Sequence, residues 1–165
     1  MVRIHLALLA PTLFLTSAAT SVREPVDPLH FFEGRTETQG LVKVLFRKDY
    51  LSRSVGQGRI EPDGSLTLVQ RVFDDGKLPH DRRWRVRQVG PGHYAGTMSE
   101  AVGPVTIDKV GDLYRFRFKM TGRLNVEQVL TPLAGGRSAS TSTKVRRFGF
   151  VVATTEGVVR KVAAN

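Results

Sequence analysis

The sequence contains no cysteine. Its absence excludes disulfides, thiol catalysis, thiolate metal ligands and lipid attachment through an N-terminal cysteine. A fold without disulfides has to be stabilised by its core alone, and the length of 165 residues is sufficient for one domain with a substantial core. We therefore expect a single cysteine-free domain that is not a lipoprotein.

The sequence also contains few Trp and Tyr residues and shows no sustained helical periodicity. The chain has one Trp and three Tyr, too few to form the aromatic girdles that are typical of a transmembrane β-barrel. Such a barrel nevertheless remains an alternative, because its strands also alternate apolar and polar side chains. Beyond the first 19 residues no apolar period of 3.6 is sustained over ten positions. Long amphipathic helices are therefore not expected.

The N-terminal segment "MVRIHLALLAPTLFLTSAATS" has the order of a secretory signal peptide. Arg3 precedes an apolar run from about Ile4 to Leu15, and small residues follow at Ser17 and Ala19. The run is too short for a spanning helix and contains a proline. We predict a signal peptide over residues 1–19, an extended linker over 20–30 and a barrel domain over 31–165, in a protein exported to the periplasm.

Positive charge is in excess, with 25 Lys and Arg against 15 Asp and Glu. Only Arg3 of these lies in the signal segment, so the remainder carries a net charge of +9. For an exported protein, this charge favours anionic head groups of the cell envelope over nucleic acid as a partner. The alternative is that the charge only maintains solubility.

Short alternating segments separated by turn signals follow one another from residue 31 onward. Asp63-Gly64 and Asp75-Gly76 are typical of tight hairpin turns. The expected strands span about 41–47, 51–61, 65–73, 82–89, 93–100, 104–110, 113–121, 124–131 and 144–155, with a further one at 157–162. The small polar segment 133–144 is expected to be a mobile loop. This order predicts an all-β, antiparallel up-and-down barrel of about 8–10 strands, or a sandwich.

Two strands alternate apolar and basic side chains. If their apolar rows face the interior, their basic rows must face outward, because successive side chains of a strand point to opposite faces. The expected cavity-wall residues are Trp84, Tyr94, Met98, Glu100, Tyr114, Phe116, Phe118 and Met120. The outward basic residues are Arg83, Arg85, Arg87, Arg115, Arg117 and Lys119, which either contact an anionic membrane surface or form a solvated face.

No catalytic or metal-binding motif is recognisable. His30, His80 and His93 lie beside turns without a ligand spacing, and Ser99 lacks the glycines of a nucleophile elbow. We therefore expect no catalytic residues, no metal and no cofactor. Glu100 is in phase with Tyr94 and Met98, which would place it near one mouth of the barrel as an acid, a base or a ligand anchor. The alternative is a strand-end side chain in solvent.

The segments "DPLHFFEGRTETQG", "RRWRV", "HYAGTMSEAVGPV", "YRFRFKM" and "RRFGFVVAT" together resemble the bacterial domain-of-unknown-function family 3833. The resemblance spans about residues 27–162. It rests on Phe31, Phe32 and Gly34, on Arg82 or Arg83 with Trp84, on Tyr94, Gly96 and Gly103, and on Phe148 with Gly149. It implies a lipocalin-like (calycin) barrel, an exported setting and no established activity.

Three functions are therefore considered. The first is a non-enzymatic barrel that binds a small apolar or amphipathic ligand such as a lipid or fatty acid. The second is a filled structural barrel that docks to the anionic envelope or a partner protein, and the third is an isomerase or hydrolase that uses Glu100. An interior volume of several hundred Å³ or more would favour the first, since ligand cavities are about 300–1,000 Å³.

Overall fold

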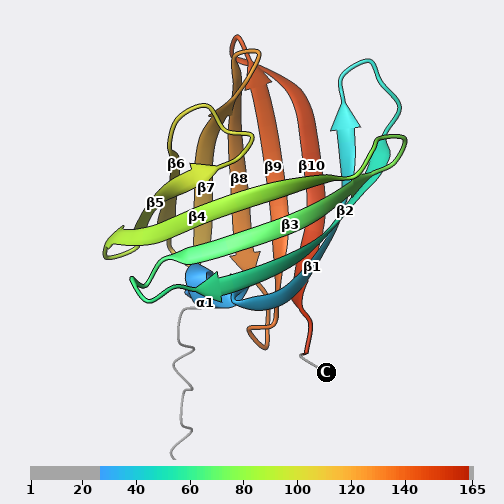
Figure 1. Ribbon diagram of the computed structural model, residues 1–165. Helices are drawn as coiled ribbons and strands as arrows, with labels where there is room; N and C mark the ends of the chain where they lie inside the picture. Colours follow the sequence, from blue (N-terminus) through green and yellow to red (C-terminus); the bar gives the residue numbers. More distant parts are fainter. Residues whose placement is uncertain (1–26, 164–165) are drawn as a thin grey trace, which may run out of the picture.

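The computed structural model describes residues 27–163. Ten antiparallel strands form a closed barrel with one short helix at one end (Figure 1). The elements are α1 (Pro28–Phe32), β1 (Gly34–Val44), β2 (Tyr50–Ile60), β3 (Leu66–Asp74), β4 (His80–Gly90), β5 (His93–Met98), β6 (Val105–Val110), β7 (Leu113–Met120), β8 (Leu124–Pro132), β9 (Ser138–Arg147) and β10 (Phe150–Lys161). The predicted up-and-down barrel is confirmed. The predicted signal peptide and residues 20–26 lie outside the described residues.

Each strand pairs with its neighbour in sequence, and β1 pairs with β10 to close the barrel. The closure brings two glycines, Gly40 and Gly157, directly opposite each other. A Cβ on Gly40 would lie 2.9 Å from the carbonyl oxygen of Glu156, and one on Gly157 would lie 2.5 Å from that of Gln39. Because only glycine lacks this atom, the pair permits the close approach of β1 and β10.

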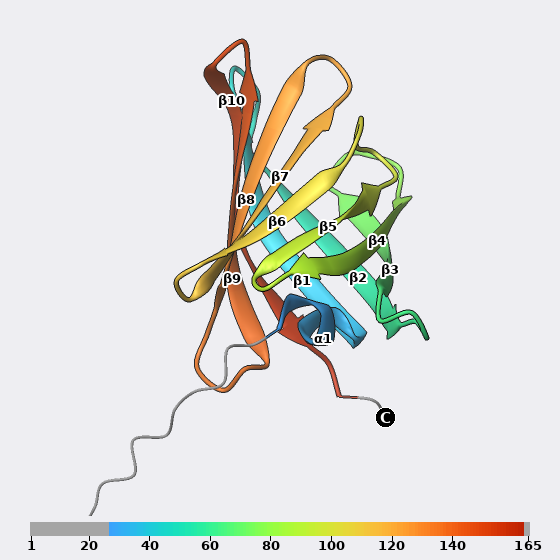
Figure 2. The same cartoon turned by 90° about the vertical axis from the view of Figure 1, so that its left-hand side faces the viewer.

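The two ends of the barrel differ. We call the end that holds α1 the closed end; the turns β2–β3, β4–β5, β6–β7 and β8–β9 lie there as well. At the opposite, open end lie the connections β1–β2, β3–β4, β5–β6, β7–β8 and β9–β10, and the hairpins β7–β8 and β9–β10 project beyond the shorter strands β5 and β6 (Figure 2). Side chains can therefore fill one end while the other opens to solvent.

Helix α1 begins at Pro28 and overlaps the last three residues of the extended linker expected over residues 20–30. The carboxylate of Asp27 accepts hydrogen bonds from the backbone N–H groups of Leu29 and His30, and Pro28 occupies the first turn, an arrangement typical of a helix start. Five residues are too few for a helix that is stable alone, so burial of Leu29 and Phe31 in the barrel must stabilise it. Within residues 27–163, no helix has the length and hydropathy needed to cross a bilayer.

Several predicted strand boundaries were wrong; for example, the strands expected at 144–155 and 157–162 do not exist as such, because β10 is one strand from Phe150 to Lys161. Strand β1 begins seven residues before the predicted 41–47, at Gly34. Its start was missed because the inward positions before residue 41 are small or polar, as at Thr38 and Gly40. The predicted strand 144–155 is instead interrupted by a turn at Phe148 and Gly149, whose φ angles are 50° and 86°. The predicted loop 133–144 contributes most of β9, since threonine fits a pleated sheet well even without an apolar row.

Candidate ligand-binding cavity

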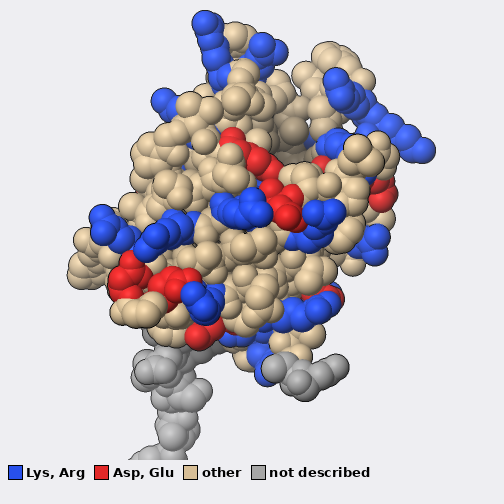
Figure 3. Space-filling view, viewed as in Figure 1, with Lys and Arg blue, Asp and Glu red and all other residues tan. Residues whose placement is uncertain are grey.

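A cavity of about 530 Å³ occupies the barrel. Its floor is formed by Pro28, Leu29 and Phe32 of α1, and its walls reach Val44 and Lys77 near the open end. The molecular surface is hollowed between the hairpins of this end (Figure 3). The interior is therefore not filled by side chains, and its volume falls in the range of small-molecule binding sites.

One wall of the cavity is apolar and aromatic. The Trp84 ring meets Phe116 and Phe118 edge to face, at centroid distances of 6.5 and 5.9 Å. The indole Nε1 of Trp84 donates to the side-chain oxygen of Gln70 at 2.8 Å. This bond satisfies the polar atom of the indole and leaves its rings to contact apolar groups. Met98 and Met120 complete the wall with flexible side chains.

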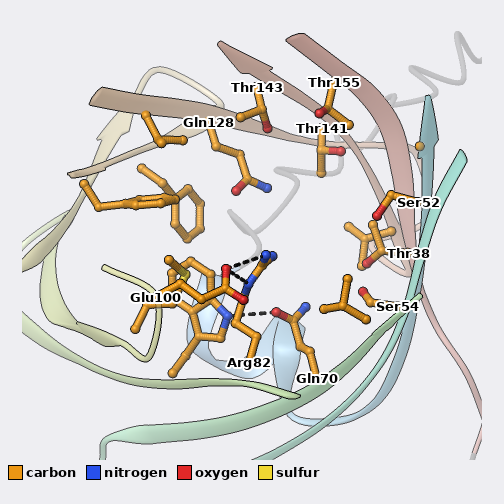
Figure 4. Close-up of a pocket in the computed structure, with 18 of the residues that line it drawn as sticks. Thr38, Ser52, Ser54, Gln70, Arg82, Glu100, Gln128, Thr141, Thr143 and Thr155 are labelled. Atoms are coloured by element: carbon orange, nitrogen blue, oxygen red, sulfur yellow. Dashed lines mark hydrogen bonds and ion pairs between the residues drawn. The ribbon is translucent and has the colours of Figure 1, made fainter. Parts of the chain in front are cut away.

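An ion pair on the wall of the cavity joins Arg82 of β4 and Glu100, which follows the neighbouring strand β5. The Arg82 guanidinium donates from Nε and Nη2 to Oε2 of Glu100, at 3.0 and 2.7 Å (Figure 4). His80 Nε2 lies 2.8 Å from the other carboxylate oxygen. Glu100 lines the cavity, and its side chain is only 24% exposed. Its polar neighbours are Arg82 and His80, so its surroundings are not purely apolar.

The facing wall carries small polar side chains. They belong to β1, β2, β8, β9 and β10, and Figure 4 shows them around the cavity: Thr38, Ser52, Ser54, Gln128, Thr141, Thr143 and Thr155. Within residues 27–163, no other side chain forms a hydrogen bond with the Gln128 amide or with the hydroxyls of Thr143 and Thr155. These groups are therefore available to the polar atoms of a ligand.

Near the open end, a second ion pair joins Asp74 and Lys77. Lys77 Nζ lies 2.9 Å from both Asp74 Oδ2 and the Tyr50 hydroxyl. Burial favours protonated Asp74, but hydrogen bonds from Ser52 and Lys77 outweigh it and lower the pKa of Asp74. Asp74 is thus ionised at neutral pH, and the pair adds no net charge to the cavity.

Six of the eight predicted cavity-wall residues line this cavity: Trp84, Met98, Glu100, Phe116, Phe118 and Met120. Tyr94 and Tyr114 do not, and their expected position was wrong. Both are buried near the closed end, where their rings meet at 6.2 Å and the Tyr94 hydroxyl donates to Asp27 Oδ1 at 3.0 Å. The register of the strands sets which height of the barrel a side chain reaches, and alternation alone does not reveal it.

The predicted basic rows lie on the outer faces of β4 and β7. Arg83, Arg85, Arg87, Arg117 and Lys119 are exposed, and Arg115 is half-buried. Three of them have carboxylate partners: Arg83 lies 3.9 Å from Asp81, Arg85 lies 2.9 Å from Asp63, and Arg117 pairs with Asp108. Their positive charge is therefore partly neutralised by the protein itself.

Arg82, Gln70, Gln128 and the hydroxyl row were missed from the sequence. Arg82 is in phase with Trp84 and Val86, so the alternation that placed Trp84 inside also placed Arg82 there. The hydroxyl side chains lie on β1, β2, β9 and β10, at inward positions that an alternation of apolar residues does not mark. Across residues 27–163, no three His, Cys, Asp or Glu side chains gather in a geometry for a metal ion.

Comparisons with known proteins agree with the fold. Residues 16–161 match the family described as protein of unknown function DUF3833, and the chain belongs to this family. The structure is similar to that of the S-type phycobiliprotein lyase from Guillardia theta, with a TM-score of 0.62 and 8% sequence identity over 83% of this chain and 92% of that one. At this identity the similarity concerns the fold. No curated protein sequence matches the chain.

Proposed function

We propose that this member of the DUF3833 family binds a small amphipathic ligand, such as a lipid or fatty acid, inside its barrel. The apolar part of the ligand packs against Trp84, Phe116 and Phe118. Its polar group faces Gln128, Thr143 and Thr155. The observation that carries the proposal is the division of one 530 Å³ cavity into an aromatic wall and a polar wall whose groups have free hydrogen-bonding capacity.

The charges within the cavity favour a ligand with at most one negative charge. Glu100 offsets Arg82, and Asp74 offsets Lys77, so Arg53 is the one charged lining residue left without an opposite charge and the lining has a single excess positive charge among residues 27–163. Hydroxyl and amide groups recognise polar atoms through hydrogen bonds without requiring a charge. A single carboxylate could also accept from the guanidinium N–H groups that Arg82 does not use for Glu100.

We also propose that binding is not coupled to catalysis. A general acid or base needs a reactive oxygen directed at the substrate, whereas Oε2 of Glu100 accepts two hydrogen bonds from Arg82 and Oε1 lies 2.8 Å from His80 Nε2. The same pairing fixes Glu100 as an anchor for the strands β4 and β5. The predicted signal peptide supports a periplasmic setting for this binding, which isolation of the mature protein and sequencing of its N-terminus would test.

Two neighbouring threonines of β10 provide a matched test. Thr155 faces the cavity, whereas Thr154 does not line it. Thr155→Phe should fill part of the cavity, and Thr154→Phe adds the same ring outside. Native mass spectrometry of protein isolated from producing cells and titration with a fluorescent fatty acid would compare them.

We expect bound ligand and fatty-acid binding in the wild type and in Thr154→Phe. In Thr155→Phe we expect affinity to fall by at least about tenfold, because an overlap of one aromatic ring removes several methylene contacts. A wild-type protein that carries no ligand and binds no fatty acid would contradict the proposal, as would equal binding by the two variants.

A further inference from the structure

Large apolar side chains are exposed at the open end of the barrel. Phe46 is 95% exposed, Leu78 88%, Phe150 76% and Phe148 63%. They belong to the turns β1–β2 and β3–β4 and to the hairpin β9–β10. Every other large hydrophobic residue of the described chain is less exposed than these four. Exposed apolar side chains concentrated at one place indicate an interaction site.

The backbone of these turns is unfavourable for the residues they contain. Within residues 27–163, the non-glycine residues with positive φ are Phe46 (60°), Arg123 (60°) and Phe148 (50°), and all three lie in open-end turns. This conformation favours glycine or asparagine and is disfavoured for bulky side chains. Folding stability does not explain aromatic residues at two such positions that are also exposed to solvent.

Unpaired positive charges surround these apolar residues. Arg47, Lys48, Arg123 and Arg147 form no ion pair within residues 27–163. The Arg123 and Arg147 guanidinium groups lie 5.8 and 5.2 Å from the centre of the Phe148 ring. Figure 3 shows positive side chains projecting from the hairpins on both sides of the hollow.

The carboxylates of the same turns do not balance these charges. Asp74 is engaged by Lys77, whereas Asp75 accepts a hydrogen bond from the neutral backbone N–H of Leu51 and keeps its charge, so Asp49 and Asp75 leave two negative charges against four basic residues. Asp49 is the remaining carboxylate of the β1–β2 turn, beside Arg47 and Lys48. The barrel wall differs, because Arg85 and Arg117 there are paired with carboxylates.

We propose that the open end docks on an anionic phospholipid bilayer. Its contact surface, which we call the rim, consists of Phe46, Arg47, Lys48, Leu78, Arg123, Arg147, Phe148 and Phe150. The apolar side chains enter the head-group region while the basic side chains meet lipid phosphates. This inference goes beyond ligand binding and does not depend on it.

The arrangement of the rim favours a membrane over a protein partner. Its four apolar residues stand on three turns of the open end, β1–β2, β3–β4 and β9–β10 (Figure 1), whereas a protein interface needs a continuous and closely packed apolar centre. A deformable bilayer can receive each turn separately. Docking in this orientation directs the cavity mouth toward the lipid.

Two pairs of substitutions with matched charge test the basic part of the rim. Arg123→Gln with Arg147→Gln changes the rim, and Arg115→Gln with Arg117→Gln changes the wall. Sedimentation with vesicles of phosphatidylcholine and phosphatidylglycerol, and of phosphatidylcholine alone, would measure binding at low and high salt. The rim pair should weaken binding to the anionic vesicles by about 30-fold, since each basic residue contributes roughly fivefold near an anionic surface. The wall pair should have little effect.

A second variant separates docking from folding. Phe46→Asn with Phe148→Asn places a residue that tolerates positive φ at both turns. We expect a melting temperature at least equal to that of the wild type and vesicle binding reduced by at least about tenfold, because two aromatic contacts are lost. Fatty-acid binding in the cavity should persist, so failure of docking and failure of ligand binding are distinguished.

The absence of cysteine allows the orientation to be measured in the full chain. A single environment-sensitive label at Thr121→Cys, in the β7–β8 turn, should report an apolar environment on vesicles. The same label at Asp112→Cys, at the closed end, should remain in water. All variants share the same N-terminus, so differences between them report on the rim.

Three results would overturn the proposal. The first is a label at position 121 that stays in water on bound vesicles. The second is loss of binding through the wall pair rather than the rim pair. The third is a wild-type dimer in solution that Phe46→Asn with Phe148→Asn converts to a monomer, since the rim would then be an interface between two copies.

Discussion

The Tyr94 hydroxyl donates a hydrogen bond to Asp27 Oδ1 at 3.0 Å, linking two residues 67 positions apart in the sequence. Asp27 also caps the first turn of α1, so one carboxylate joins the helix to strand β5. Burial, and then the bond to Asp27, raises the pKa of the Tyr94 phenol well above its ordinary value. Tyr94 is therefore protonated at any physiological pH, and it holds the floor of the cavity in place.

Removal of this hydroxyl should loosen the closed end. We expect Tyr94→Phe to lower the free energy of unfolding by about 1 kcal/mol, the typical net contribution of one intramolecular hydrogen bond. Urea denaturation measures the change. Tyr114→Phe is the matched control, because this neighbouring phenol is also buried but makes no side-chain hydrogen bond within residues 27–163. Equal losses in both variants would show that the Tyr94–Asp27 bond adds nothing specific.

A glycine of β2 determines how closely α1 approaches the barrel. A Cβ on Gly58 would lie 1.9 Å from the carbonyl oxygen of Phe32. We expect Gly58→Ala to displace α1, to destabilise the fold by about 1–3 kcal/mol as other overpacked positions do, and to increase hydrogen exchange in residues 28–32. Gly90→Ala is the control, since the nearest atom to its added methyl would be 4.0 Å away. Slow exchange in α1 of Gly58→Ala would contradict this view of the helix contact.

The sequence contains most of the information for the barrel, because alternation and turn residues act locally. The Asp63-Gly64 and Asp75-Gly76 turns and the strand expected at about 113–121 were predicted correctly. The Phe148-Gly149 turn was missed, since a phenylalanine at positive φ contradicts local preference. Departures of this kind are expected where function rather than stability selects the residue.

The residues that line the cavity were harder to predict from the sequence than the strands. Alternation correctly separated inward from outward rows, but it cannot assign a height along the barrel. Tyr94 and Phe116 both face inward, yet one contacts the capping residue of α1 and the other lines the cavity. Strand register and the position of α1 decide this difference. Both depend on contacts between residues far apart in the sequence.

The Arg82–Glu100 pair should be sensitive to the loss of one partner. We expect Arg82→Met to destabilise the fold by about 1–3 kcal/mol, because Glu100 then remains a partly buried carboxylate without its main hydrogen-bond donor. Arg82→Met with Glu100→Leu should recover most of this loss, since neither polar group is left unpaired. A double-mutant cycle of urea denaturation measures the coupling. Additive losses would mean that the two side chains do not stabilise each other.

Acid stability should depend on the β2–β3 turn. Hydrogen bonds to Asp63 from the Ser65 hydroxyl and backbone N–H, and then from Arg85, lower its pKa from 3.8 to about 2. Between about pH 4 and pH 2 the unfolded state binds more protons than the folded state, so the contribution of Asp63 to folding stability is present above pH 4 and is lost as the pH falls from about 4 to 2.

We expect Asp63→Asn to be less stable at neutral pH and to show a flatter dependence of stability on pH between about 4 and 2 in urea denaturation. Asp112→Asn removes the same charge from the β6–β7 turn without breaking a side-chain hydrogen bond within residues 27–163. If both variants change the acid limb equally, net charge rather than the Asp63 hydrogen bonds is responsible.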